Sequence, residues 1–516
     1  MAVFMTADEA VKLVKDGDTV VLSGAGGGLL EASRLMEALG RRFEETAEPK
    51  NLTLVHVSGL GDRKGSGLGH LAHRGLVKRV IGGHWGMAPK MSALAAEEEI
   101  EAYNLPQGVL SQLMREIAGG RVGLITHVGL GTFIDPRIEG GKLNKKARED
   151  IVQVIEIAGQ ERLFFPSFKP NIALIKGSIC DELGNISLER EPANLENLSI
   201  AQAVHNSGGK VIVQVQQVVE ARNLHPRLVK IPACLVDVIV VVPDQWQNVL
   251  EPYNPGLSGE KRIPISALKP MLLDERKVIA RRAAMEIKPY SLINIGVGMP
   301  DGIAAVAAEE GFSDKITFTI EQGLYGGVPA GGVLFGMTYN PECIMDAPYQ
   351  FDFFDGGGLD TACLGLAQVD RFGNVNVSKM GKAVIGTGGF VNIAQNAKKV
   401  VFCGTFTGGG LQVEVKERKL QITQEGKYTK FVADVDQITF SGKYAISRGQ
   451  EVLYVTERAV FQLTPQGVVL CEIAPGVDLE KDILNLMPFK PLIAPDLKVM
   501  DERIFDEGKM GLGEKF

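Results

Sequence analysis

The sequence predicts an α/β protein with two similar, open, mainly parallel-sheet domains that arose by an ancient duplication. Three observations lead to this prediction. Short runs of β-branched residues alternate with helical stretches along the chain. Several motifs occur twice and in the same order. The length of 516 residues suits two domains, each with enough residues for its own core.

The predicted strands are short apolar runs of the kind that parallel sheets bury on both faces. Helical stretches, such as 31–43 and 301–310, lie between several of them. Strands that alternate with helices in this way are typical of parallel α/β sheets. The six runs that predict strands most clearly are 20–22, 52–55, 211–213, 238–242, 292–295 and 400–402.

The evidence for the duplication is three pairs of similar motifs that occur in the same order in both halves of the chain. Each pair shares a local pattern, either a strand before a glycine turn and helix, an Asp-x-x-Gly-Asn turn, or an Ile-Ala-Gln helix before a strand. The pairs are 20–26 with 292–298, 181–186 with 370–375, and 200–202 with 393–395. Three matches in one order indicate descent from a common unit.

The predicted boundary between the halves lies in a proline-rich stretch. Four prolines (Pro252, Pro255, Pro264 and Pro270) occur there with Asn254, Gly256 and Gly259, and the stretch has no clear periodicity. We therefore predict an N-terminal domain over 1–243, a linker over 244–275 and a C-terminal domain over 276–516. Sites shared by two domains often lie in the cleft between them.

The two halves differ in the groups they offer for chemistry. The segment 53–61 is repeated as 317–325, and Glu321 in the second copy corresponds to Val57 in the first. Gly388 and Gly389 in the second half likewise correspond to Leu195 and Glu196. The carboxylate and the glycines both belong to the second half, which predicts an asymmetric site on a symmetric scaffold.

Glu321 follows a predicted strand and precedes a glycine-rich turn. The carboxyl ends of strands in an open α/β sheet are where ligands bind. On spacing alone, this carboxylate suits a nucleophile, a base or a turn residue that accepts a backbone hydrogen bond. Gly388 and Gly389 precede a predicted helix at 390–396, where backbone amides stabilise an oxyanion, although a plain tight turn explains them equally well.

Other chemistries find little support. The loop at 296–298 lacks the third glycine of a dinucleotide fingerprint, because Asp301 stands there, and the 24–28 loop lacks the Lys-Ser/Thr of a P-loop. His70 and His73 have no cysteine or carboxylate cluster beside them, so we expect no metal. No G-x-S-x-G elbow is present.

The composition excludes other function classes and indicates a compartment. The net charge of −7 does not indicate nucleic-acid binding, which favours a basic surface. No apolar run is long enough to span a membrane. Six widely spaced cysteines without a CxxC pair indicate a reduced protein. The first eight residues contain no signal-peptide pattern. We therefore expect a cytoplasmic protein without nucleic-acid or membrane partners.

The segment around Glu321 resembles the catalytic glutamate loop of family I coenzyme A transferases. The resemblance covers essentially the whole chain and is strongest to the fused propionate/acetate CoA-transferase group. Its motifs are 321–329 (EQGLYGGVP), 351–360 (FDFFDGGGLD), 373–379 (GNVNVSK) and 402–407 (FCGTFT) in the second half, and 103–108 (YNLPQG) and 128–137 (VGLGTFIDPR) in the first.

This resemblance implies CoA transfer between a short acyl-CoA and a free carboxylic acid, by a ping-pong mechanism through a glutamyl-CoA thioester on Glu321. It implies that Gln107 reaches the reacting centre from the other half, and that Gly388 and Gly389 supply the oxyanion site. It further implies that Gly404, Gly408 and Gly409 approach CoA, although a plain loop explains them nearly as well. CoA acts as co-substrate, with no other cofactor. The family suggests a homo-oligomer, and we expect a tetramer.

Some features leave the substrate and the reaction open. Gln322, Leu324 and Tyr325 are larger than the residues expected after the nucleophile, and Tyr325 is predicted to narrow or reshape the acyl pocket. The preferred acyl chain is therefore undetermined. A short-chain acyl-CoA hydrolase on the same scaffold is the first alternative. A non-enzymatic acyl-CoA sensor is the second, and an intact Glu321 loop argues against it.

Overall fold

The computed structural model describes residues 2–264 and 271–516. By packing, the chain divides into two compact units. Unit 1 comprises Met1–Ile263, Ile320–Asp352 and Lys379–Asn392, and unit 2 comprises Pro264–Thr319, Phe353–Ser378 and Ile393–Phe516. The predicted domain limits describe halves of the chain rather than packing units and stay a prediction. Part of the predicted linker, 265–270, lies outside the described residues.

Unit 1 is built on an eight-stranded sheet whose described pairs are all parallel. The central strands are mostly buried, which is what a sheet covered on both faces requires, whereas the two residues of the edge strand, Val3 and Phe4, are exposed. In sheet order they are β1 (Val3–Phe4), β15 (Val238–Val241), β12 (Lys210–Val215), β9 (Ile172–Lys176), β2 (Thr19–Leu22), β3 (Leu52–His56), β4 (Val77–Gly82) and β5 (Glu101–Asn104).

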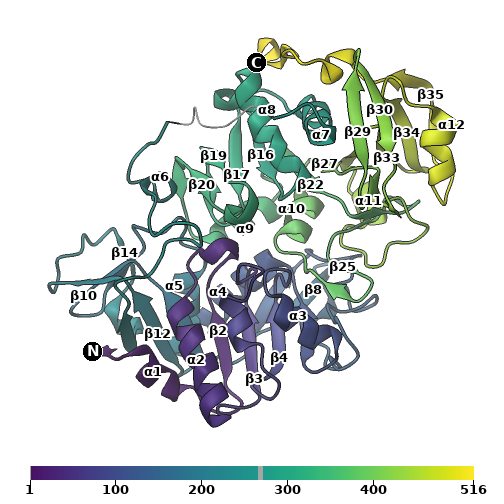
Figure 1. Ribbon diagram of the computed structural model, residues 1–516. Helices are drawn as coiled ribbons and strands as arrows, with labels where there is room; N and C mark the ends of the chain where they lie inside the picture. Colours follow the sequence, from purple (N-terminus) through teal and green to yellow (C-terminus); the bar gives the residue numbers. More distant parts are fainter. Residues whose placement is uncertain (1, 265–270) are drawn as a thin grey trace. The chain divides into compact units, whose positions relative to one another are not determined.

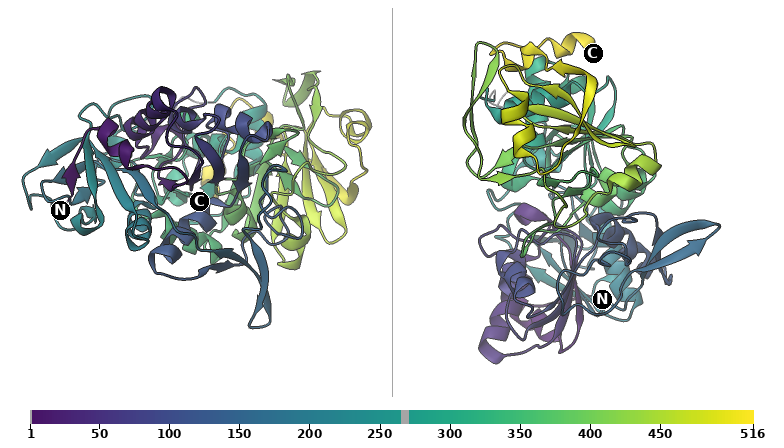
Figure 2. Two further views of the ribbon diagram at one scale, coloured as in Figure 1. Left: turned by 90° about the horizontal axis from the view of Figure 1, so that it is seen from below. Right: turned by 90° about the vertical axis from the view of Figure 1, so that its right-hand side faces the viewer.

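The main helices of unit 1 follow these strands in the chain, as Figure 1 shows. They are α2 (Ser33–Thr46), α3 (Pro89–Ala96), α4 (Gln107–Ala118) and α5 (Asn197–Asn206), and α4 packs beside α5. A separate small sheet joins β6 (Gly123–Thr126), β8 (Gln160–Pro166) and β7 (Gln153–Ile157). Its β7–β8 hairpin projects from the rest of unit 1 in both views of Figure 2.

The sheet of unit 2 has a parallel part followed by a mixed part, in which two antiparallel pairs precede a final parallel pair. Its parallel strands are β17 (Thr317–Ile320), β16 (Leu292–Ile295), β22 (Thr361–Gly365), β27 (Lys399–Cys403) and β32 (Glu451–Val455). The order continues through β33 (Ala459–Thr464), β34 (Gly467–Ile473) and β35 (Leu492–Val499). Helices α7 (Glu275–Ala284) and α8 (Gly302–Glu310) pack against each other in this unit. The predicted α/β class with largely parallel sheets is confirmed.

One repeated motif folds identically in the two units. In the first copy, the Asp181 carboxylate accepts the Asn185 amide at 2.9 Å and the Asn185 side chain at 3.0 Å. In the second copy, Asp370 accepts the same two groups of Asn374 at 3.0 and 2.9 Å. The same Asx turn in both places supports the duplication that the sequence predicts.

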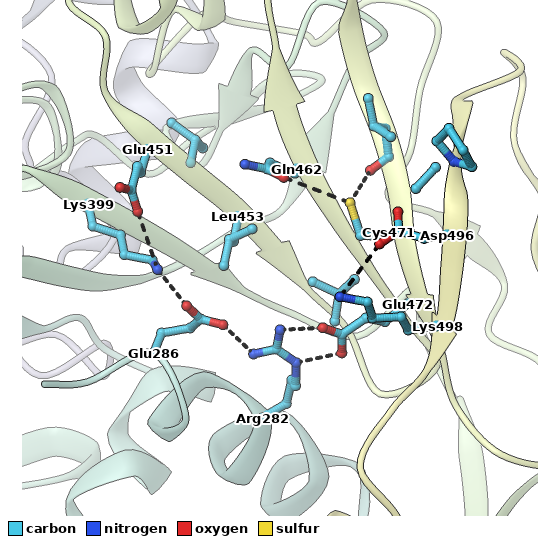
Figure 3. A pocket seen from close by; sticks show the side chains of 15 residues that line it. Arg282, Glu286, Lys399, Glu451, Leu453, Gln462, Cys471, Glu472, Asp496 and Lys498 are labelled. Atoms are coloured by element: carbon cyan, nitrogen blue, oxygen red, sulfur yellow. Dashed lines mark hydrogen bonds and ion pairs between the residues drawn. The ribbon is translucent and has the colours of Figure 1, made fainter.

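A chain of ion pairs crosses one face of the unit 2 sheet and lines a pocket of about 410 Å³ (Figure 3). The Arg282 guanidinium of α7 binds both oxygens of Glu472 on β34, at 2.8 and 2.7 Å. It also donates to Glu286 at 2.6 Å. Because its side chain is only 7% exposed, Arg282 depends on these carboxylates for its solvation. Glu451, which pairs with Lys399 at the rim, is by contrast 68% exposed.

This network predicts unequal stability effects for two glutamates. Glu472→Ala leaves a buried guanidinium without its bidentate partner and is expected to destabilise the protein by about 3 kcal/mol. Glu451→Ala removes an exposed pair and is expected to cost less than about 0.5 kcal/mol. Thermal unfolding followed by circular dichroism measures both, with an expected fall of about 6–12 °C for Glu472→Ala. Equal shifts in the two variants would contradict this account.

Three further features concern the described residues as a whole. Over 2–264 and 271–516, no helix has the length and apolar character that crossing a membrane requires. Within the same ranges, no three His, Cys, Asp or Glu side chains gather as a metal site. The six cysteines form no disulfide, and Cys180, Cys363 and Cys403 are buried.

Candidate active site

Three neighbouring strands of unit 1 end at one edge of its sheet, and the loops after them meet a glycine loop from the second half of the chain. Strands β3, β4 and β5 end at His56, Gly82 and Asn104. Because parallel strands place their carboxyl ends together, the following loops gather at this edge. The loop 385–389, which belongs to unit 1 by packing, lies against them.

Backbone hydrogen bonds hold this glycine loop in place. The Trp85 amide donates to the Ile385 carbonyl at 2.7 Å, and the Gly388 amide donates to the Gly83 carbonyl at 2.8 Å. In return, the Gln107 amide donates to the Gly388 carbonyl at 2.9 Å. The loop is therefore joined to the ends of β4 and β5 from both directions.

Glycine is required within this loop at Gly386. Its φ of +83° is rarely adopted by residues with a side chain, and a Cβ there would lie 2.8 Å from the Cα of His84. The absence of a side chain thus lets the loop approach the β4 end closely.

Gln107 and Gly388, two residues predicted for the site, lie together. Gln107 opens α4 and is only 2% exposed. Its side-chain oxygen lies 3.6 Å from the point that a Cβ of Gly388 would occupy. The following residue, Gly108, donates its amide to the Asn392 side chain at 3.1 Å. The structure thus brings Gln107 and the glycine loop into one place, although they are far apart in sequence.

The backbone amides of Gly388 and Gly389 differ in how well they are placed to donate a hydrogen bond to a substrate. The Gly388 amide is engaged by the Gly83 carbonyl, so this donor is already used within the protein. Gly389 directly precedes α10 (Phe390–Asn396), and amides at a helix start have no intrahelical acceptor. Of the predicted pair, Gly389 is therefore the better placed to donate to an oxyanion.

One histidine that sequence reasoning did not connect with the site, His84, lies beside this loop, and a second, His56, packs edge-on against the Trp85 ring. His84 Cδ2 is 3.9 Å from the Cβ point of Gly388. Burial lowers the pKa of His84 to about 4 and that of His56 to about 4, so both imidazoles are neutral near pH 7. The sequence could have indicated both residues by their positions, because His84 follows β4 and His56 ends β3. Functional residues often lie at the carboxyl ends of parallel strands.

Glu321 lies at the end of β17 and is 8% exposed. A tight turn follows it, in which the Gly323 amide donates to the Ile320 carbonyl at 3.1 Å and the Met345 amide donates to the Gly323 carbonyl at 2.9 Å. Gly323 has a φ of +98°, and a Cβ there would lie 2.1 Å from the Met345 carbonyl oxygen. The sequence Glu-x-Gly thus ends the strand and fixes the direction of the Glu321 backbone.

The residues around Glu321 are anchored in an apolar core of unit 1. Ile320 and Leu324, on either side of the carboxylate, are buried with Ala25, Leu29 and Leu30 from the first glycine loop. The Gln322 side chain is 3% exposed and packs on Gly336. Tyr325 is half-buried, and burial raises the pKa of its phenol to about 12. A buried, firmly anchored carboxylate is suited to covalent chemistry because its orientation is set in advance.

A second loop in unit 1 repeats the geometry of the glycine loop with bulkier residues. Leu195 has a φ of +51° and Gly388 one of +53°. The Ala347 amide donates to the Leu195 carbonyl at 3.0 Å, just as the Gln107 amide donates to that of Gly388. The duplication therefore produced two related loops. The loop with Gly388 and Gly389 has no side chains at positions where the other loop has Leu195 and Glu196.

The glycines predicted to approach CoA lie in unit 2 and differ from one another. Gly404 is buried, and a Cβ there would lie 2.8 Å from the Leu366 side chain, so close packing accounts for it. Gly408, in β28 (Thr407–Gly408), is half-buried, and Gly409 is exposed. Nothing tests their predicted role directly, and the role stays a prediction.

Glu31 is a buried carboxylate at the same edge of the unit 1 sheet. It is 4% exposed and accepts the Gly61 amide at 2.6 Å. Burial raises the pKa of Glu31 from 4.5 to about 8, so the folded protein binds a proton that the unfolded chain releases between these values.

This proton uptake predicts a pH-dependent effect of Glu31→Gln. Between about pH 4.5 and 8, the folded state holds more protons at this site, so its stability falls as pH rises, by about 1.4 kcal/mol per pH unit. Glutamine retains the acceptor for Gly61 and lacks the titration. The variant is expected to gain stability relative to wild type from pH 5 to pH 8. Urea unfolding midpoints across this range measure the difference, and parallel curves would refute the prediction.

A family model described as Coenzyme A transferase matches residues 4–242. The acetate CoA-transferase YdiF of Escherichia coli strain K12 is 47% identical over 508 residues, covering 98% of this chain and 96% of that protein. The chain belongs to the coenzyme A transferase family. The resemblance drawn from the motifs is thereby confirmed, and the chain is a CoA-transferase.

Two further comparisons place this CoA-transferase among its relatives. The caffeate CoA-transferase of Acetobacterium woodii is 47% identical over 521 residues, covering 99% of both chains. A crystal structure of the acyl-CoA transferase YdiF from Escherichia coli O157:H7, a thioester complex with CoA, matches with a TM-score of 0.95 and 46% identity over 99% of this chain and 97% of that one. The fold of the CoA-transferase is therefore that of YdiF. These acetate and caffeate CoA-transferases, each 47% identical to this chain, are named for different acids.

Proposed function

We propose that this CoA-transferase moves CoA between a short-chain acyl-CoA and a free carboxylate of the acetate or propionate type, through a glutamyl-CoA thioester on Glu321. The observation that carries the proposal is Glu321 itself. It is a buried carboxylate at a strand end, fixed by the Gly323 turn, in a chain 47% identical to an acetate CoA-transferase.

In the first half-reaction, a Glu321 oxygen attacks the acyl-CoA carbonyl carbon. The tetrahedral intermediate collapses, the carbon–sulfur bond breaks, and CoA leaves as a thiolate, which gives a mixed anhydride. The thiolate then attacks the Glu321 carbonyl carbon and releases the donor acid, which gives the glutamyl-CoA thioester. The acceptor acid reverses both steps. A carboxylate attacks as the anion, which has no proton to remove during the attack, so this route requires no general base.

Each addition creates an oxyanion that requires a donor. The Gly389 amide and the Gln107 side-chain amide are our candidates for this role, because the Gly388 amide already donates to Gly83. Donors fixed before the reaction stabilise the transition state without reorganisation. Neutral His84 beside the loop adds no positive charge that would hold the departing thiolate.

Similarity to the relatives does not by itself indicate that the enzyme prefers short acyl chains, so we propose this preference separately. Relatives of equal identity are named for acetate and for caffeate. Tyr325 is half-buried and lies four residues after Glu321, and we propose that its ring limits the size of the acyl group. The two relatives thus define the two acids that a test compares.

The experiment is an exchange assay with acetyl-CoA as donor and propionate as acceptor. Equal amounts of propionyl-CoA and acetate are expected, with little free CoA when the acid is omitted. Free CoA that forms without an acid would replace this proposal by the hydrolase alternative. A preference for caffeate over propionate by a factor of ten or more in kcat/KM would overturn the short-chain assignment.

The cellular setting is a further part of the same proposal. We place the enzyme in the cytoplasm, supported by six cysteines without a disulfide. We also propose a homo-oligomer, most simply a tetramer. Light scattering after size-exclusion chromatography tests the oligomer, and a mass near the 55.6 kDa of one chain would overturn it.

A further inference from the structure

The His84 imidazole is seated among three glycines just after β4. Its Nδ1 lies 2.6 Å from the point that a Cβ of Gly59 would occupy, and its Cε1 lies 3.1 Å from the Cβ point of Gly86. Its Cδ2 lies 3.9 Å from the Cβ point of Gly388. Because Nε2 is bonded to Cε1 and Cδ2, it lies on the ring edge between Gly86 and Gly388.

Backbone hydrogen bonds fix His84 from both sides along the chain. The preceding residue, Gly83, donates its amide to the His56 carbonyl at 3.0 Å. Gly86, two residues after His84, donates its amide to the Ile385 carbonyl of the glycine loop at 2.9 Å. The imidazole is therefore held in place before a substrate arrives, which is what a donor to a transition state requires.

The His84 ring has one N–H to offer and no protein acceptor for it. Within residues 2–264 and 271–516, neither ring nitrogen has a hydrogen-bond partner, and Nδ1 is buried. Buried N–H groups without an acceptor are rare in proteins, so the single proton of the neutral ring is assigned to Nε2. Burial, together with nearby Arg63 and His56, lowers the pKa of His84 to about 4, which keeps the ring neutral near pH 7.

The space in front of Gly388 has two polar side chains as neighbours. The Cβ point of Gly388 lies 3.6 Å from the Gln107 side-chain oxygen and 3.9 Å from His84 Cδ2. In the described part of the chain, the neighbours of Gly388 in sequence aside, no other atom lies within 4 Å of this point. An oxygen atom placed there would contact both the side-chain amide and the imidazole.

We propose that the Nε2–H of His84 donates a hydrogen bond to the oxyanion that each addition creates, which makes His84 a further catalytic residue of the transfer. This inference rests on the proposed function, which supplies the tetrahedral intermediates. The proton stays on Nε2 throughout. The oxyanion returns its electron pair to the carbonyl when the bond to the leaving thiolate or carboxylate breaks. A fixed neutral donor stabilises the oxyanion without binding the departing anion strongly.

The first test removes the donor with little change in side-chain size. His84→Leu is expected to lower kcat for exchange between acetyl-CoA and propionate about 100-fold, the effect of losing one oxyanion donor. KM for acetyl-CoA is expected to stay within about threefold, because the donor acts in the transition state. His84→Gln, whose amide places an N–H near the position of Nε2, is expected to recover about tenfold of the loss. His73→Gln, a half-buried histidine beside Phe43, is the matched control and is expected to behave as wild type.

A second test displaces the ring without changing it. Gly59→Ala would place a Cβ 2.6 Å from Nδ1, so the His84 ring must move, and kcat is expected to fall about tenfold. Gly69→Ala is the matched control, since no atom lies within 4 Å of its Cβ position and neither glycine has a positive φ. This pair tests the inference even if circular dichroism shows that His84→Leu does not fold.

Three outcomes would overturn the inference. One is a folded His84→Leu enzyme that keeps kcat within about threefold of wild type. Another is a His84→Gln enzyme as slow as His84→Leu, which would mean that the shape of the ring matters and its N–H does not. The third is equal activity of Gly59→Ala and Gly69→Ala. Failure of the proposed function is distinct, because wild type would then exchange no CoA between acetyl-CoA and propionate.

Discussion

Glu321→Gln is expected to reduce kcat for CoA exchange by at least about 10,000-fold, the scale on which loss of a covalent nucleophile acts. Glutamine matches the size of glutamate, but its amide does not form the anhydride. The assay is acetate-dependent exchange between acetyl-CoA and labelled acid. Glu31→Gln, a second buried carboxylate of unit 1, is the control and is expected to stay within about tenfold of wild type. An active Glu321→Gln enzyme would remove Glu321 from the mechanism.

Gly323→Ala is expected to lower kcat about 100-fold, because a displacement of about 1 Å at a reacting group has an effect of this size. The new Cβ would lie 2.1 Å from the Met345 carbonyl oxygen, at a φ of +98°, so the turn after Glu321 must move. Steady-state kinetics and circular dichroism separate loss of activity from loss of fold.

Gly332→Ala is the matched control for this change. Gly332 lies in the same segment and has a φ of +64°, but no atom lies within 4 Å of its Cβ position. It therefore carries similar backbone strain without the collision. If Gly332→Ala were as impaired as Gly323→Ala, strain alone would account for the loss, and the close packing at Met345 would have no special role.

Local pattern was sufficient to predict the elements that build the site. Buried β-branched runs became β2, β3 and β16, and the predicted helix at 390–396 is α10 with the same limits. The repeated turn at Asp181 and Asp370 folds alike in both copies because its hydrogen bonds are local. Motifs whose geometry depends on near neighbours along the chain were thus predictable.

Contacts between distant segments were not predictable from the sequence. Nothing local indicates that the Gly388 amide is engaged by Gly83, or that His84 lies beside the glycine loop. The segment Ile320–Asp352 packs with unit 1 although it lies in the second half of the chain. Tyr428 faces Gly408 only through strand pairing. Each depends on tertiary packing, which hydrophobic periodicity does not encode.

The most direct test of the central claim is intact-mass and peptide analysis of the protein after incubation with acetyl-CoA or propionyl-CoA without an acceptor acid. A CoA adduct on the peptide that contains Glu321, absent from Glu321→Ala, is the predicted result. It would identify the glutamyl-CoA thioester. No adduct with either donor, together with no acid-dependent exchange, would contradict covalent short-chain CoA transfer on Glu321.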